Sequence, residues 1–75
     1  MPGAATVPKL GRLREIRESK FLSQAMLSRR SGVSRPTIHR LETSDEEARY
    51  STMWKLAEAL GVEPGELVGS PQQST

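Results

Sequence analysis

The chain has 75 residues and a net charge of +2, and it contains no cysteine. This length allows one small domain that buries only about 60% of the surface of its unfolded chain, so dimerisation would help to stabilise it. The absence of cysteine excludes disulfides, thiol nucleophiles and cysteine-bound zinc. No apolar run is long enough for a signal peptide or a membrane span, so we expect a cytoplasmic protein that makes no contact with a membrane.

The charge is divided unevenly along the chain. Residues 1–40 hold nine Lys and Arg against two acidic residues, whereas residues 41–75 hold two against seven. This segregation favours one basic face that meets a polyanion. It is equally consistent with two oppositely charged halves that pair with each other.

The chain begins and ends in segments without periodicity. Residues 1–8 are small and contain prolines, so we expect a flexible arm, and residues 70–75 are expected to form a flexible tail. Between them, residues 9–69 form the single predicted domain. Apolar residues at helical spacing predict its first helix over residues 9–19. No stretch has the alternation of a convincing strand.

Two further helices are predicted on either side of a glycine. Ser23 is a good N-cap for a helix from Gln24 to Ser31, which Gly32 ends. Ser34 caps the next helix, so Pro36 falls in its first turn, where backbone N–H groups have no intrahelical partner. The proline also prevents the two helices from joining into one.

The acidic half of the chain begins with a polar loop, residues 43–48. Ser51 can cap a fourth helix, which Gly61 ends. The inner side of that helix carries four apolar residues, Met53, Leu56, Ala57 and Leu60. Glu63 and Pro64 then predict the start of a short fifth helix. The sequence therefore predicts an all-α fold, a compact bundle of five short helices.

The third predicted helix combines polar and apolar sides within the basic half of the chain. An α-helix fits the major groove of DNA, while a second helix can rest across it on the backbone. The outward positions are Ser34, Arg35, Thr37, His39 and Arg40, and the inward ones are Val33, Ile38 and Leu41. This division is typical of a helix that reads bases.

With these elements the sequence resembles the Cro/repressor-type (XRE-like) helix-turn-helix family, over residues 16–42 and 51–67. The residues at the family's spacing are Ser23, Gln24, Leu27, Ser28, Gly32, Ile38, Leu41 and Glu42. The resemblance implies a fold of the lambda-repressor-like type. It also implies a sequence-specific regulator of transcription, a repressor that binds double-stranded DNA as a homodimer on an inverted-repeat operator.

The resemblance also implies roles for single residues. Base readout falls to Ser34, Arg35, Thr37 and Arg40, and phosphate contacts fall to Ser23, Gln24 and Thr43. Pro36 replaces a polar reader of many relatives, and Pro36 and His39 are further possible DNA contacts. Arg17 and Glu42 match a buried ion pair that ties the first helix to the third, which we interpret as structural.

The sequence departs from the family pattern most clearly in the loop after the third helix. Ser44 stands where a glycine usually turns the chain, and Asp45, Glu46 and Glu47 follow where many relatives are basic. These carboxylates cannot grip phosphate. They either hold nearby arginines or turn away from DNA.

Three apolar residues are candidates for a dimer interface. Trp54 lies beside the inner side of the fourth helix, so it either covers the edge of the core or contacts a second subunit. Leu67 and Val68 in the fifth helix raise the same alternative.

Other functions stay open at this point. The same fold serves controller proteins of restriction systems and antitoxins that regulate their own operon. In another class, a protein-interaction module without DNA binding would explain the acidic loop. We expect no enzyme and no cofactor, because no catalytic motif is present and the core is too small to shape a pocket. No metal is expected, because His39 is the only histidine and has no neighbouring ligands.

Overall fold

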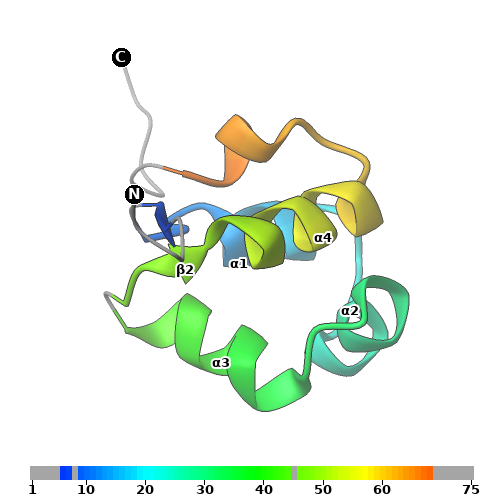
Figure 1. Cartoon of the computed structure of the whole chain (residues 1–75). Helices are drawn as coiled ribbons and strands as arrows, with labels where there is room; N and C mark the ends of the chain where they lie inside the picture. The colour runs from blue at the N-terminus through cyan, green and yellow to red at the C-terminus, as the bar shows by residue number, and fades with distance from the viewer. Residues whose placement is uncertain (1–5, 8, 45, 69–75) are drawn as a thin grey trace.

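The computed structural model describes residues 6–7, 9–44 and 46–68. Within these residues the helices are α1 (Leu13–Ser19), α2 (Gln24–Ser31), α3 (Arg35–Thr43), α4 (Tyr50–Leu60) and the 3₁₀ helix η1 (Pro64–Leu67) (Figure 1). Two short strands accompany them, β1 (Thr6–Val7) and β2 (Ala48–Arg49). The helical fold class is as predicted, but the described chain has four α-helices and not five.

The element predicted as a fifth helix is a single 3₁₀ turn. Its backbone bonds span three residues, from Glu66 N to Glu63 O at 2.9 Å and from Val68 N to Gly65 O at 3.3 Å. Glu63 N also donates to Glu66 Oε2 at 3.1 Å. Because Val68 already has extended backbone, only four residues are helical, which is the usual length of such a turn.

The strand pair joins distant parts of the chain. Thr6 pairs with Arg49 and Val7 with Ala48, in antiparallel register. The expectation that no strand forms was therefore wrong. A strand of two residues is too short to show the alternating pattern by which strands are predicted. The predicted tail, residues 70–75, lies outside the described residues, as does most of the predicted arm, and the domain limits stay predictions.

The helix caps follow the predicted pattern at most ends. Ser23 Oγ accepts a hydrogen bond from Met26 N at 3.1 Å, and Ser34 Oγ accepts one from Thr37 N at 3.4 Å. Gly32 and Gly61 end α2 and α4 with φ of 80° and 75°, a left-handed conformation in which glycine has no steric penalty.

Two helices begin at other residues than expected. α1 starts at Leu13 and not at residue 9, because the turn before it is closed by a bond from Leu13 N to Leu10 O at 3.1 Å. α4 starts at Tyr50, before the predicted cap Ser51, because the chain enters it directly from β2. Its N-cap is Arg49, whose side chain makes no capping bond.

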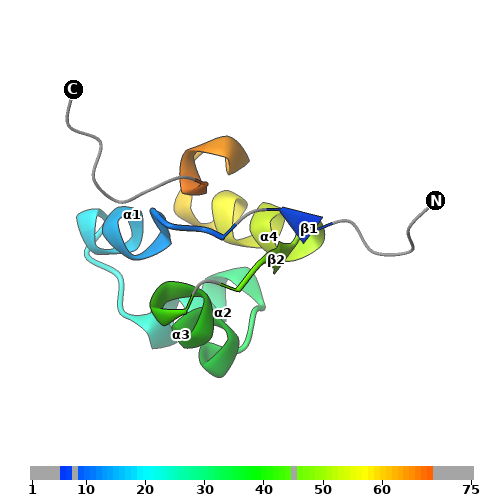
Figure 2. The ribbon, with the colours of Figure 1, turned by 90° about the vertical axis from the view of Figure 1, so that its left-hand side faces the viewer.

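The core lies where the helices meet. The buried apolar residues are Leu10, Leu13, Ile16, Leu22, Leu27, Val33, Ile38, Leu41, Ala48, Met53, Leu56, Ala57, Leu60 and Leu67. η1 lies at one end of the molecule, α1 and α4 lie in the middle, and α2 and α3 form the opposite end (Figures 1 and 2). None of the described helices is long and apolar enough to cross a membrane.

Candidate nucleic-acid interface

The two sides of α3 differ as the sequence predicts. The inward residues Val33, Ile38 and Leu41 are buried in the core. Of the outward residues, Thr37 is half-buried and the other four are exposed, namely Ser34, Arg35, His39 and Arg40. Because α3 lies at one end of the molecule, this polar side is available to a large ligand.

The first turn of α3 is held by its own side chains. Ser34 Oγ accepts from Thr37 N and donates to Thr37 Oγ1 at 2.8 Å, so the Thr37 hydroxyl keeps its own hydrogen for another acceptor. Pro36 lies in this turn and costs no hydrogen bond there. Arg35 beside it has no ion-pair partner in the described part of the chain and can reach outward.

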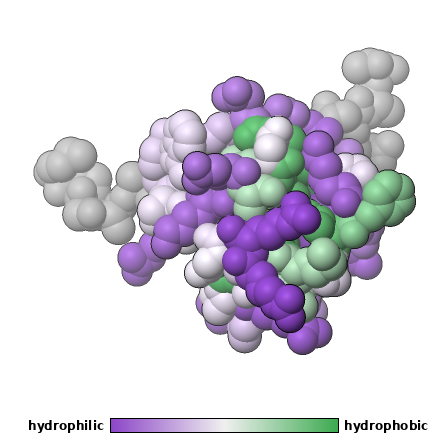
Figure 3. Space-filling model, turned by 90° about the vertical axis from the view of Figure 1, so that its right-hand side faces the viewer, coloured by the Kyte–Doolittle hydropathy of each residue, from purple (hydrophilic) through white to green (hydrophobic). Residues whose placement is uncertain are grey.

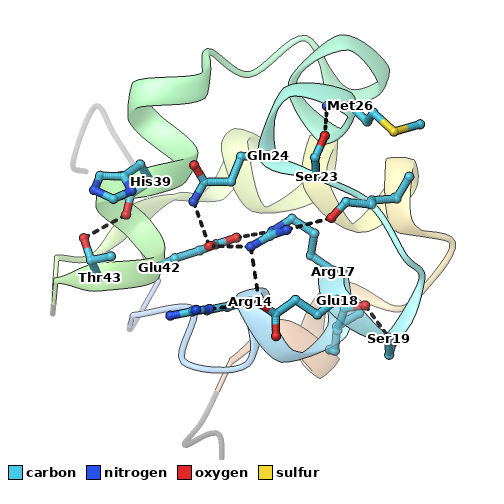
Figure 4. A network of polar contacts seen from close by, with 12 residues as sticks. Arg14, Arg17, Glu18, Ser19, Ser23, Gln24, Met26, His39, Glu42 and Thr43 are labelled. Atoms are coloured by element: carbon cyan, nitrogen blue, oxygen red, sulfur yellow. Dashed lines mark hydrogen bonds and ion pairs between the residues drawn. The ribbon is translucent and has the colours of Figure 1, made fainter.

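A buried ion pair connects α1 with the C-terminal end of α3. Arg17 donates to both oxygens of Glu42, from Nε to Oε2 at 2.6 Å and from Nη2 to Oε1 at 3.0 Å. Its Nη1 donates to the carbonyl of Leu22 at 2.6 Å, and Gln24 Nε2 donates to Glu42 Oε1 at 2.9 Å (Figure 4). This is the arrangement of Arg17 and Glu42 that the resemblance implies.

The network fixes α3 relative to α1 and α2. The side chain of Glu42 is only 1% exposed and that of Arg17 is 9% exposed, so water competes little for these bonds. The hydrogen bond to Glu42 raises the pKa of the Arg17 guanidinium, although burial acts in the opposite direction. The Arg17 guanidinium therefore stays charged beside the buried Glu42 side chain.

The residues assigned to phosphate contacts lie at two places. Ser23 and Gln24 stand together at the start of α2, where the exposed Ser23 hydroxyl still has its hydrogen to donate. One amide hydrogen of Gln24 is used on Glu42, which leaves the other free. Thr43 stands at the end of α3, and its hydroxyl donates to the carbonyl of His39 at 2.8 Å. A phosphate contact from Thr43 therefore requires this hydroxyl to turn outward.

The backbone conformation at the end of α3 explains why Ser44 can stand where the family usually has a glycine. Ser44 has φ of −121°, an extended backbone that does not need glycine. Its hydroxyl donates to the carbonyl of Arg40 at 2.8 Å and accepts from Glu46 N at 3.3 Å. The loop is thereby folded back toward α3.

The acidic loop holds one of the predicted base readers. Glu46 Oε1 lies 3.2 Å from Nε of Arg40, and both side chains are more than half exposed. Of the two alternatives for this loop, Glu46 follows the first and pairs with an arginine. Asp45 lies outside the described residues.

Two hollows flank the exposed side of α3. One of about 260 Å³ lies between α3, the acidic loop and the start of α4, and its lining is Thr37, Arg40, Leu41, Glu46, Glu47, Ala48, Arg49 and Thr52. The other, of about 340 Å³, is lined by Gln24, Arg35, Pro36 and His39. The sequence predicted all residues of the second hollow as contacts, but only Thr37 and Arg40 of the first, and it did not show that the two spaces are separate.

Both interpretations of the charge pattern, pairing of the two halves and a basic face, apply to part of the charged residues. Ion pairs from Arg17 to Glu42 and from Arg40 to Glu46 join the basic and acidic halves of the chain. In the described part of the chain, Arg29, Arg30 and Arg35 form no ion pair. Pairing of the halves thus neutralises some arginines and leaves positive charge along α2 and the start of α3.

Phe21, between α1 and α2, has an unusual backbone conformation that the helical spacing did not predict. Its φ is 59°, a left-handed conformation that is unusual for a bulky residue, and its side chain is 92% exposed. The side of the molecule with α2 is mostly hydrophilic with apolar side chains between, and the half-exposed Met26 also belongs to α2 (Figure 3). A helix usually ends at a glycine in the left-handed conformation, but the sequence has no glycine between the end of α1 and Ser23. This lack of glycine is the one sign in the sequence that another residue has to adopt the left-handed conformation here.

The predicted dimer residues have different surroundings. Leu67 is fully buried, so of the two alternatives for this residue the structure favours a place in the core. Val68 is partly buried against the core. Trp54 is 48% exposed and packs edge-to-face against the exposed Tyr50, with ring centroids 6.1 Å apart.

The part of the chain that the structure describes contains no group of three His, Cys, Asp or Glu side chains that could hold a metal ion.

The arrangement defines a class of protein. α2 and α3 are joined by a tight turn at Gly32, α2 braces α3 through Gln24 and Glu42, and α3 presents polar side chains at its N-terminal end. This is the helix-turn-helix arrangement, in which the second helix enters the major groove.

Comparison with known proteins agrees with this class. A sequence model of the helix-turn-helix family matches residues 13–67, and the chain belongs to this family. The chain is similar to the crystal structure of the restriction-modification controller protein C.AhdI from Aeromonas hydrophila, with 41% identity and a TM-score of 0.73 over 80% of this chain and 92% of that chain. A search of curated proteins gave no match. The protein is a DNA-binding transcriptional regulator of the XRE-like type.

Proposed function

We propose that the protein is a repressor that binds an inverted-repeat operator as a homodimer, with α3 in the major groove of each half-site. The observation that carries this proposal is the exposed, unpaired Arg35 at the start of a helix that a buried network holds in place. A preformed reading helix loses little flexibility on binding, so its contacts contribute more fully to affinity. Such a regulator acts in the cytoplasm, where it meets DNA.

The residues of the interface divide into readers and anchors. Arg35 can donate two hydrogen bonds to O6 and N7 of a guanine, which discriminates against a wrong base by about 1–3 kcal/mol. Ser34, Thr37 and Arg40 complete the base contacts, and His39 lies beside them. Ser23, Gln24 and Thr43 contact phosphates and orient α3, without reading sequence themselves.

The proposed dimer places two copies of α3 about 34 Å apart, one turn of DNA. The exposed pair of Tyr50 and Trp54 is the surface that favours this association, because tryptophan and tyrosine are enriched at the centres of interfaces. Val68 contributes at its edge, whereas Leu67 does not.

A controller protein of a restriction-modification system is the second candidate, and the similarity to C.AhdI favours it. It would use the same interface and differ only in the genes that it regulates. An autoregulating antitoxin would likewise use this interface. Transcription of the neighbouring genes with and without this protein separates these roles.

A protein-interaction module without DNA binding is the alternative of another class, and the acidic loop beside α3 supports it. Arg35→Glu distinguishes it from a regulator. Reversing this charge should abolish binding to DNA, whereas a protein contact made through α4 and η1 should not change.

Selection from a random pool of duplex DNA tests the proposed function. At about 0.15 M salt, where exposed charges are well screened, we expect an enriched inverted repeat with half-site centres about 10 bp apart. A pool that stays unenriched with the folded protein would exclude specific reading of DNA by this chain.

A further inference from the structure

The hollow between the starts of α2 and α3 has the chemistry of a binding site for one kind of base. Its lining residues are Gln24, Arg35, Pro36 and His39. Three of them are exposed on α3, and Gln24 reaches across from α2, beside His39 (Figure 4). The hollow is therefore part of the surface that meets DNA in the proposed function, on which this inference rests.

Two walls of the hollow are fixed before any ligand arrives. Gln24 donates to Glu42, whose side chain is almost fully buried and is held by Arg17. The ring of Pro36 locks its own backbone angle within the first turn of α3. A ligand group that enters here meets a surface of defined shape.

The hollow is open, which decides the size class of its ligand. A small molecule needs a site that buries some 70–90% of its surface, and four side chains on an exposed helix do not provide this. The edge of a base in a duplex needs no such enclosure, because contacts elsewhere on the backbone already hold the DNA.

The lining disfavours a base that presents an amino group in the major groove. Pro36 has no N–H and no polar side-chain atom, so an amino group of adenine or cytosine placed against it would lose its hydrogen bond to water without a replacement. Thymine presents a C5 methyl group there and an O4 acceptor beside it. The methyl group suits the proline ring, and O4 suits the N–H donors of Gln24, Arg35 or His39.

We propose that this hollow holds the C5 methyl group of a thymine next to the base that Arg35 reads, with Pro36 as the apolar contact. Pro36 is then a specificity-determining residue and not only a helix-start residue. Every half-site of the operator should contain this thymine.

Replacing thymine by uracil tests the inference, because it removes the methyl group and leaves all hydrogen-bonding groups in place. Each thymine of the selected half-site is replaced in turn in synthetic duplexes, and the dissociation constant is measured by fluorescence anisotropy. One position should weaken binding by about fourfold, the effect of removing one buried group of methyl size. The other positions should change binding by less than about twofold.

The Pro36→Ala variant shows whether the methyl group acts through the proline. It should bind the thymine and uracil duplexes with nearly equal affinity, whereas Pro64→Ala, in the distant η1, should keep the full difference. Thermal unfolding of both variants confirms that they are folded. A fourfold uracil effect that persists in Pro36→Ala would assign the effect to DNA shape and overturn the inference.

The proposed function and the thymine contact can be overturned separately. If no operator is enriched, the proposed function is wrong and the inference falls with it. If an operator is enriched and every thymine tolerates uracil, the proposed function stands and the inference alone is overturned.

Discussion

At the scale of single residues, Arg17 and Glu42 matter more than any other charged pair in the described chain. They are the only two charged groups there that combine deep burial with two direct hydrogen bonds to each other. A buried charge that loses its partner is strongly destabilising, whereas an exposed one is rehydrated.

We predict that Arg17→Met lowers the free energy of unfolding by about 3–5 kcal/mol, because it strands the buried Glu42. Arg14→Met is the matched control, since Arg14 pairs with Glu18 in an exposed position, and it should cost less than about 1 kcal/mol. Urea unfolding measures both. Equal effects of the two substitutions would show that the buried network does not stabilise the fold.

The pH dependence of this contribution follows from the raised pKa of Arg17. When the pKa of a basic group is higher in the folded state than in the unfolded state, the group stabilises the fold. This stabilisation is fully present at pH values below the unfolded-state pKa, and it is lost as the pH rises through the folded-state pKa. Both values lie above the working range, since arginine stays protonated. Protonation of Arg17 should therefore add no pH dependence to the free energy of unfolding of the parent protein between about pH 6 and about pH 9, as urea unfolding measures.

A further prediction at this scale rests on the backbone conformation of Phe21. A left-handed conformation costs a residue with Cβ roughly 1–2 kcal/mol, and the exposed ring makes few contacts that would offset this. We expect Phe21→Gly to be more stable than Phe21→Ala by about 1 kcal/mol, measured by urea unfolding. If alanine is the more stable of the two, Phe21 does not have this conformation in solution.

At the scale of elements, the end of α3 and the acidic loop form one unit. Ser44 bonds both to the carbonyl of Arg40 and to Glu46 N, and Glu46 pairs with the Arg40 side chain. In the proposed function DNA would compete with Glu46 for Arg40, and the loop would then weaken binding even though it lies beside α3.

We predict that Glu46→Gln strengthens binding to the operator by roughly two- to fivefold, the value of an exposed ion pair, because it frees Arg40. The slope of log K against log salt should become steeper by up to about 0.9, since one more positive charge is available to the DNA. In an Arg40→Ala background, Glu46→Gln should change the affinity and the salt slope only by the small effect of removing one negative charge near the DNA. Unchanged binding by the single variant would mean that Arg40 does not contact DNA.

The sequence predicts those elements whose signals are local. Ser23, Ser34, Gly32 and Gly61 each act within one turn of helix, and all four are found where they were expected. The pairing of β1 with β2 depends on residues some forty positions apart and has no local pattern. The burial of Leu67 likewise depends on how η1 packs on the core, which spacing alone does not reveal.

The candidate site shows the same limit. Which side chains point outward from α3 follows from helical spacing, but their partners do not. The pairing of Arg40 with Glu46 depends on how the loop folds back, and the hollow at Pro36 depends on the angle between α2 and α3. Family resemblance added the pairing of Arg17 with Glu42, which spacing could not supply.

At the scale of the whole molecule, the small core and the exposed aromatic pair are the two features that support the proposed dimer. A small domain buries a limited share of its surface, and Tyr50 with Trp54 leaves an apolar area on α4 in water. We predict that Trp54→Ala weakens self-association by roughly 30-fold or more, as at an interface hot spot. Met26→Ala, which removes a similarly exposed side chain from α2, should leave it unchanged.

Sedimentation equilibrium over a range of concentrations measures this effect, and circular dichroism shows that both variants are folded. A parent protein that stays monomeric at all concentrations would exclude the dimer in the absence of DNA. Equal weakening by both substitutions would place the interface elsewhere than on α4.

The central claim is that the outward side of α3 reads base sequence. Its most direct test is the ratio of affinities for the selected operator and for the same duplex with one half-site guanine changed, measured for the parent and for Arg35→Ala. We expect the parent to prefer the operator by about 5- to 150-fold, the range of one bidentate contact, and Arg35→Ala to lose this preference while it still binds both duplexes. Arg29→Ala, on α2, should lower both affinities alike. If Arg35→Ala keeps the full preference for the operator, α3 does not read this base through Arg35 and the account is contradicted.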